Sequence, residues 1–242
     1  LTHNLIHFHP LRHMQTAIIE GRLSMVKFCL RGGKVAVHRS VKSILGEVLS
    51  QILNVPVLSG LMVTYFYFKL PAGEPNALTG YLWAMVFICL IPLCSLFFYI
   101  PVKDEETQKT VHRQRVASFI LMMVSYPVGW LVLSLTGSPR IFTAIAATYT
   151  FVTLGLIFFN LLLRYKASGH AAGVSGPVAS MIYIYGLVAT PLLALLPLVT
   201  WARLAAKGHN FWQTVVGAVL SALISASVLW VYGFTPFGGL IW

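Results

Sequence analysis

Long apolar segments alternate with short polar connections over most of the chain. The first four apolar runs cover about residues 48–68, 79–101, 116–136 and 140–163, and a last one covers about 212–230. Each is close to the roughly 20 residues that a helix needs to cross the hydrocarbon core of a bilayer. Short polar or charged stretches separate the first four runs. The pattern predicts a series of membrane-spanning helices.

Residues 171–202 form an apolar stretch that is too long for one span and contains Gly186, Pro191 and Pro197. Helices usually end before a proline, because the ring removes a backbone donor and clashes with the preceding turn. We therefore predict a hairpin of two short helices that turns near Gly186–Pro191. A hairpin brings the loop around His170 and the loop around 203–209 to the same membrane face, whereas a single span would separate them.

The predicted fold is an all-α membrane protein with six to seven transmembrane helices in a bundle. Residues 1–43 form a polar, basic flank that we expect to be flexible, and residues 44–242 form the polytopic membrane domain. The flank begins at Leu1. In the alternative interpretation, the protein starts at Met14 or Met25, and the residues before that methionine are an upstream extension of the reading frame. No apolar run near Leu1 has the length of a signal peptide.

The composition supports the membrane assignment and excludes an ordinary soluble domain. Of the 242 residues, 57% are hydrophobic and 10% are charged, against about 25% charged residues in a typical soluble domain. The bilayer is therefore a predicted partner of the chain. Basic loops that we expect on one side of the membrane predict that this face is cytoplasmic.

The distribution of charge indicates an anionic ligand. The net charge is +11, all six carboxylates lie at or before Glu106, and eight Lys or Arg residues follow. The basic residues lie at the ends of apolar runs and form no continuous stripe, so nucleic acid is not a predicted partner. Cys29, Cys89 and Cys94 are isolated, and we predict neither a metal nor a cofactor. Oligomeric state is left open.

Two segments carry candidate chemistry, and both lie at ends of apolar helices. The first runs from Lys166 through Ser168, Gly169 and His170, and the second contains Arg203, His209 and Gln213. On a helix that starts near His209, positions 209, 213 and 217 share one face. A glycine at 217 lets that face pack closely against a neighbour.

These residue types suit phosphoryl transfer without a metal. Lys and Arg neutralise phosphate oxygens, Arg in a bidentate manner. Backbone N–H groups at a helix start add donors for the same oxygens. One histidine can attack phosphorus while a second protonates the leaving oxygen.

The two segments resemble motifs of the type 2 phosphatidic acid phosphatase superfamily. Ala167-Ser168-Gly169-His170 is similar to its Pro-Ser-Gly-His motif, and Arg203 with His209 is similar to its third motif, Ser-Arg, five residues, His, three residues, Asp. The resemblance covers about residues 160–230. It implies a metal-independent membrane phosphatase or phosphotransferase that acts on a lipid phosphate or diphosphate, of the phosphatidate or polyprenyl type.

The resemblance also implies roles for individual residues. His209 would be the nucleophile, His170 the general acid, and Arg203 a catalytic phosphate ligand with Ser168 and Gly169. Lys166 would replace the basic residues of the first family motif, which is absent. Gln213 stands in the place of the aspartate; its carbonyl can fix the tautomer of a histidine without stabilising an imidazolium by charge.

Two alternatives to a phosphatase remain open. The first is a catalytically inactive relative that serves as a lipid-phosphate-binding or structural membrane subunit, which Gln213 and the missing motif favour. The second is a small transporter, which is disfavoured because no span contains the carboxylates that often mark ion coupling.

Overall fold

The computed structural model describes residues 41–94 and 107–238, and every regular element in these ranges is a helix. The all-helical fold is therefore confirmed for the described part of the chain. The predicted flank at 1–43 lies almost wholly outside it. The elements in chain order are α2 (Val41–Ile52), α3 (Val55–Lys69), α4 (Ala77–Ala84), η1 (Met85–Leu90), α5 (Ile91–Cys94), α6 (Thr107–Leu135), α7 (Arg140–Ile157), η3 (Phe158–Leu162), α8 (Gly169–Tyr185), η4 (Gly186–Ala194), α9 (Leu195–Ala205) and α10 (Phe211–Val231).

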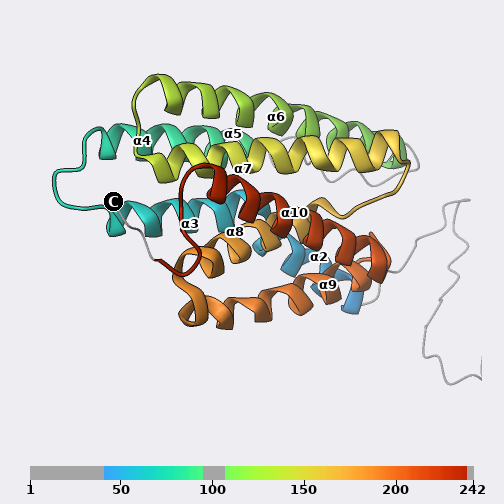
Figure 1. Ribbon diagram of the computed structural model, residues 1–242. Helices are drawn as coiled ribbons and strands as arrows, with labels where there is room; N and C mark the ends of the chain where they lie inside the picture. The colour runs from blue at the N-terminus through green and yellow to red at the C-terminus, as the bar shows by residue number, and fades with distance from the viewer. Residues whose placement is uncertain (1–40, 95–106, 239–242) are drawn as a thin grey trace, which may run out of the picture. The chain divides into compact units, whose positions relative to one another are not determined.

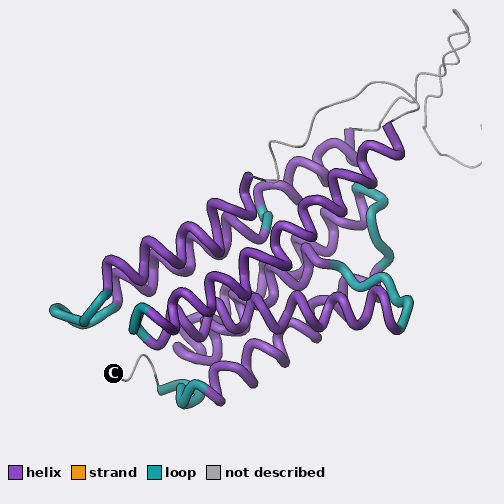
Figure 2. Tube along the Cα trace, turned by 90° about the horizontal axis from the view of Figure 1, so that it is seen from above, coloured by secondary structure: helices purple, strands orange, loops and turns teal. Residues whose placement is uncertain are grey.

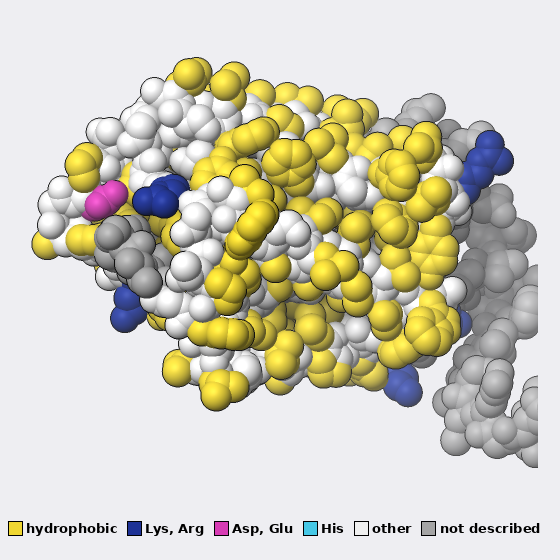
Figure 3. All heavy atoms as spheres, in the orientation of Figure 1, with side chains coloured by type: hydrophobic (Ala, Val, Ile, Leu, Met, Phe, Trp, Pro, Cys, Tyr) yellow, Lys and Arg dark blue, Asp and Glu magenta, His cyan; other side chains and the backbone are white. Residues whose placement is uncertain are grey.

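Five helical segments in the described residues are long and apolar enough to cross a membrane: Val41–Lys69, Ala77–Cys94, Arg140–Leu162, Gly169–Ala205 and Phe211–Val231. Apolar side chains cover most of the face seen in Figure 3, and basic side chains lie near its two ends. Large hydrophobic residues with high exposure, such as Leu187 and Val188 at 86% each, would be unfavourable in water. The chain is a multi-pass membrane protein.

Helix α7 lies inside the bundle. In the span Arg140–Leu162, which contains α7, 72% of the most apolar 18-residue stretch is buried, against 22–33% of the corresponding stretches in the other four spans. Helix α7 contacts α4, α6, α8 and α10, and Figure 1 shows it running alongside α6. Figure 2 shows the helices of the bundle lying side by side along a roughly common direction. Small residues along its buried surface, among them Ala144, Ala146 and Ala147, let these neighbours approach closely.

The predicted hairpin is present. Helix α8 ends at Tyr185, Gly186 takes a φ of 65°, and a 3₁₀ segment leads into α9. Both α9 and the 3₁₀ segment pack against α8. Glycine adopts this backbone conformation without the steric cost that a side chain adds. The start of α8 and the end of α9 consequently lie at the same end of the bundle, as the hairpin requires.

The first apolar run differs from the prediction, because it is two helices instead of one. Asn54 interrupts it: the Asn54 side chain accepts a hydrogen bond from the Val55 backbone N–H at 2.8 Å, and Pro56 follows at the second position of α3. An asparagine N-cap with proline in the first turn is a standard helix start. The break leaves α2 beside α9, where a Cβ atom on Gly46 would clash with Ala205 Cβ and with the backbone of Ala202 and Ala206.

The close packing predicted at Gly217 is confirmed. A Cβ atom on Gly217 would meet the Ser168 backbone, with the Ser168 nitrogen at 3.0 Å and its carbonyl carbon at 3.1 Å. Helix α10 therefore approaches the start of α8 at a distance that only glycine allows.

We expect Gly217→Val to destabilise the protein, because the new side chain must push α10 away from the Ser168 backbone. The cost should be about 2–3 kcal/mol, the upper range of overpacking in a rigid site. Thermal unfolding in detergent micelles measures it. Ser227→Val, at an exposed position of the same helix, is the matched control and should melt near the wild-type temperature; equal melting of both variants would contradict the packing argument.

Candidate functional site

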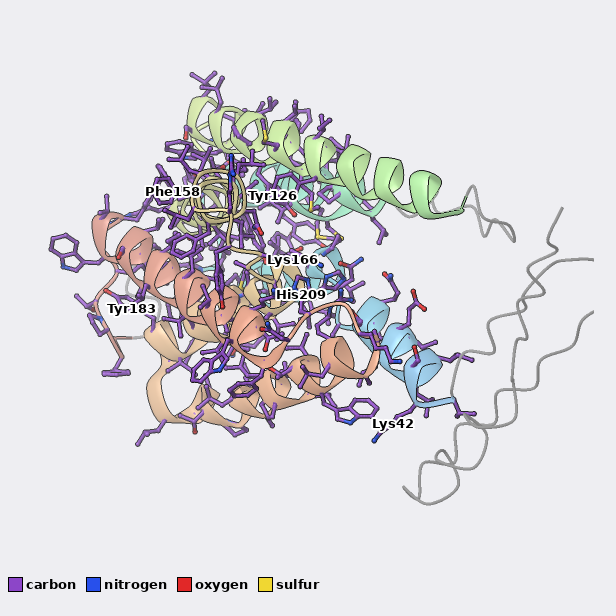
Figure 4. The ribbon with its side chains drawn as sticks, turned by 90° about the vertical axis from the view of Figure 1, so that its right-hand side faces the viewer. Lys42, Tyr126, Phe158, Lys166, Tyr183 and His209 are labelled. Carbon is purple, nitrogen blue, oxygen red and sulfur yellow. The ribbon has the colours of Figure 1, made fainter. Side chains whose placement is uncertain are left out.

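Two loops and the four helix ends that they connect meet at one end of the bundle. The first loop, residues 163–168, leads from η3 to α8, and the second, residues 206–210, leads from α9 to α10. The Lys166 ammonium donates a hydrogen bond to the Gly208 carbonyl at 3.3 Å, which joins the two loops directly. Figure 4 looks onto this end and shows Lys166 and His209 close together, with Tyr183 in a different part of the bundle.

The His209 ring is held by Gln213. Its Nδ1 atom lies 3.3 Å from Gln213 Oε1, and the same oxygen accepts the Asn210 backbone N–H at 3.1 Å. The Asn210 side chain in turn accepts the Gln213 backbone N–H at 2.9 Å, which completes a capping box at the start of α10. An oxygen acceptor opposite Nδ1 favours the tautomer with the proton on Nδ1 and the lone pair on Nε2. Gln213 thus both starts the helix and orients the histidine.

Helix α10 begins at Phe211, two residues after His209, so the predicted helical repeat of 209, 213 and 217 is replaced by a cap. The His209 and Gln213 side chains are still in contact, because the cap conformation brings the His209 ring against the Gln213 side chain.

Arg203 reaches the same loop from the last turn of α9. Its guanidinium lies against Gly208, where an added Cβ would clash with Nη2 and would meet Cζ at 3.0 Å. The Gly208 N–H donates to the Arg203 carbonyl at 3.1 Å. The absence of a side chain at position 208 therefore leaves space for the guanidinium beside the residue that precedes His209.

Ser168 connects α8 to α10 and is fully buried. Its hydroxyl is the N-cap of α8 and accepts the Ala171 N–H at 3.4 Å, while its own N–H donates to the Gln213 carbonyl at 2.9 Å. Gly169 follows as the first residue of the helix and is partly exposed. The predicted phosphate contacts of Ser168 and Gly169 stay predictions. Ser168 clearly positions the positive end of α8 beside that of α10.

His170 is the second residue of α8 and is partly buried. It lies in the first turn after the Ser168 cap, at the end of the bundle where His209 is located. Its predicted role as general acid stays a prediction.

Burial and positive charge lower the pKa of His209. The pKa falls from the ordinary 6.5 to about 4, first because the ring is buried, then because Arg203 and Lys166 repel the protonated form. Hydrogen bonding to Gln213 and to the Lys166 backbone opposes this shift and raises the pKa. His209 is therefore neutral at pH 7, beside two positive charges.

The sequence did not indicate that α2 contributes to this end of the bundle. Arg203 Nη1 donates to the Ser50 hydroxyl at 3.0 Å, across 153 residues of sequence, and Ser50 is fully buried. A serine in an apolar helix is common, so nothing in the local sequence distinguishes Ser50. Its importance follows only from the packing of α2 against α9.

Comparisons with known proteins assign no family: no family model, curated protein or solved structure matches the chain. Within the described ranges no group of three His, Cys, Asp or Glu side chains is placed to hold a metal ion. The resemblance to the phosphatase superfamily therefore stays a prediction, and the site is characterised by its own geometry: a neutral histidine, an arginine, a lysine and two helix N-termini.

We expect Ser50→Ala to disturb the Arg203 guanidinium, because it removes an acceptor from a hydrogen bond to a charged group. The free energy of unfolding should fall by about 1.5–3 kcal/mol, measured by chemical or thermal unfolding in micelles. Ser59→Ala is the matched control, since Ser59 is also fully buried but donates to the uncharged backbone carbonyls of Pro56 and Ile88. A loss of stability no larger than that of the control would contradict the role of Ser50.

The His209 pKa predicts a pH dependence that NMR titration of a ¹⁵N-histidine sample can check. The ring should titrate near pH 4, and Arg203→Gln should raise its pKa because one repelling charge is removed. Since the folded pKa lies below the unfolded one, the unfolded chain binds more protons between about pH 4 and 6.5, so this group lowers stability as the pH falls through that window. Lys69→Gln, at the far end of α3, should leave the titration unchanged; a wild-type value near 6.5 would contradict the site electrostatics.

Proposed function

We propose that the protein is an integral membrane phosphatase or phosphotransferase that acts on a lipid phosphate or diphosphate through a phosphohistidine on His209, without a metal. The observation that supports this best is the neutral His209 ring held between Gln213, Arg203 and Lys166. A nucleophilic imidazole must be unprotonated, and the phosphate that it attacks needs cations close by. This end of the bundle provides both conditions.

The proposed reaction has two steps. In the first, the Nε2 lone pair attacks phosphorus and the bond from phosphorus to the leaving oxygen breaks, which is the lipid oxygen of a monophosphate or the bridging oxygen of a diphosphate. Protonated His170 gives its proton to that oxygen. In the second, His170 takes a proton from water or another hydroxyl acceptor, whose oxygen then attacks the phosphohistidine and restores His209. Arg203 and Lys166 neutralise the phosphoryl oxygens in both steps, and the positive ends of α8 and α10 add to this charge.

Gln213 determines how fast such an enzyme can be. Its oxygen can hold the Nδ1 proton in place, but it carries no charge to stabilise a positive ring. By analogy with other His–Asp pairs, loss of the carboxylate costs about 10²- to 10⁴-fold in rate.

The hydrogen bonds of Gln213 and Ser168 favour a second candidate function, a protein that binds a lipid phosphate without turnover. Gln213 Oε1 is shared between His209 and the capping box, and Ser168 has its hydroxyl and its N–H engaged within the fold. Both residues have a sufficient structural reason to be present. Binding by Arg203 and Lys166 needs neither nucleophile nor acid.

For the membrane topology we propose six or seven crossings. Phe119–Leu135 of α6 is apolar and 17 residues long, which makes it the sixth. The α8–α9 hairpin counts as two short helices, which gives seven. By the positive-inside rule, the basic loops around the site support a cytoplasmic position for this end of the bundle.

The decisive experiment measures phosphate release from a panel of lipid phosphates and diphosphates in the presence of EDTA. Wild type should release phosphate, and His209→Ala should lose at least about 10³-fold of the rate, because the nucleophile is removed. Gln213→Asp should raise the rate by about 10²-fold or more, since it restores the charge of a His–Asp pair. Lys69→Ala, remote from the site, should match wild type.

The outcomes separate the two candidates. Binding of a lipid phosphate without release by wild type or Gln213→Asp would leave the binding protein as the function. Release that persists in His209→Ala would contradict the phosphohistidine.

A further inference from the structure

Two basic residues in the site loops have a backbone conformation that side chains rarely adopt. Arg164 has a φ of 51° and Lys207 a φ of 54°, and both side chains are exposed. Among the described residues other than glycine, only Asn76 and Phe237 also have a positive φ. Asparagine tolerates this region, whereas lysine and arginine have no intrinsic preference for it.

Both positions follow the C-cap residue of a helix, where glycine is the usual residue. After α9, the Lys207 N–H donates to the Leu204 carbonyl and the Gly208 N–H to the Arg203 carbonyl, the two bonds of a Schellman motif. After η3, the Tyr165 N–H, which follows Arg164 in the chain, donates a hydrogen bond to the Phe159 carbonyl. A glycine would make either turn without strain. The chain instead places a positive charge at each position, at a cost in stability.

The two strained residues lie on either side of the contact that joins the loops. Arg164 is two residues from Lys166, and Lys207 is bonded to Gly208, which Lys166 contacts. Neighbouring Cα atoms are 3.8 Å apart, so both residues begin close to the His209 site. Neither contacts a carboxylate within residues 41–94 and 107–238.

The charges exceed what one phosphate group requires. Arg203 and Lys166 already match the two negative charges of a phosphate monoester. Arg164 and Lys207 add two more, on exposed side chains of the same two loops that carry Lys166 and His209. A ligand with two adjacent phosphate groups carries more negative charge than a monoester and has contacts for these additional cations.

We propose that Arg164 and Lys207 bind a second phosphate group, which makes the preferred ligand a diphosphate over a monophosphate. This inference rests on the proposed function of the site, since it assumes that Arg203 and Lys166 hold the first phosphate. Membrane-surface anchors could be placed at any loop position free of strain. Positions that favour glycine are a costly choice unless the charge has a specific partner.

The backbone conformation allows a test that separates binding from folding. Arg164→Gly and Lys207→Gly each remove one charge and relieve a strained φ, so both variants should melt at the wild-type temperature or above it. Arg164→Lys and Lys207→Arg keep the charge on the same backbone and are the matched controls. A loss of binding in the glycine variants then cannot be assigned to unfolding.

The probes are farnesyl monophosphate and farnesyl diphosphate in detergent micelles, with phosphate and pyrophosphate as arms without a lipid tail, and calorimetry gives each Kd. Every protein in this comparison carries His209→Ala so that no ligand is hydrolysed, and wild type here means that Arg164 and Lys207 are unchanged. Wild type should bind the farnesyl diphosphate at least about tenfold more tightly than the monophosphate. Each glycine variant should lose several-fold in diphosphate affinity, the double variant should lose the preference, and the monophosphate Kd should change less than about twofold. The charge-keeping variants should behave as wild type. Pyrophosphate should show the same pattern if the tail adds only affinity.

The outcomes distinguish failure of this inference from failure of the proposed function. Equal wild-type affinity for both farnesyl ligands, or glycine variants that keep the preference, would overturn the second phosphate subsite alone. Wild type that binds neither ligand would overturn the phosphate site itself.

Discussion

The candidate site depends on the contact between the start of α8 and the first turns of α10. Ser168 donates its N–H to the Gln213 carbonyl, and Gly217 removes the side chain that would hold the helices apart. This contact brings two helix N-termini together, and their partial positive charges add to those of Arg203 and Lys166. The adjoining loop then carries His209 into a partly buried, positively charged position. Without the contact, the same residues would lie on separate helix ends.

Much of this end of the bundle could be predicted from the sequence because the signals are local. Apolar run lengths predicted the helices, and Gly186 with Pro191 predicted the hairpin that brings Arg203 back toward Ser168. A glycine eight positions after His209 predicted a close helix contact. In each case the physical cause is a property of a short segment: its length, its backbone freedom or the size of a side chain.

Other features depend on distant contacts or on competition between local signals. The break at Asn54 was missed because apolar residues continue on both sides, although the asparagine cap with a following proline was visible. Ser50 acquires its role from Arg203, 153 residues later. The cap at Asn210 was missed because the repeat of His209, Gln213 and Gly217 suggested a helix that begins earlier. The pKa of His209 depends on burial and on the charges of Arg203 and Lys166. The pattern of apolar and polar residues along the chain does not indicate such contacts.

The site combines segments that are made at very different times during synthesis. Ser50 belongs to the first described helix, whereas Gln213 and Gly217 belong to α10, the final one. Helices that enter the membrane in chain order would leave Arg203 beside α2 before His209 has its cap. The arrangement of the candidate site can therefore be completed only when α10 docks against α8. A ribosome-bound chain that lacks this helix would have the cations of the site without the helix start that positions His209 among them.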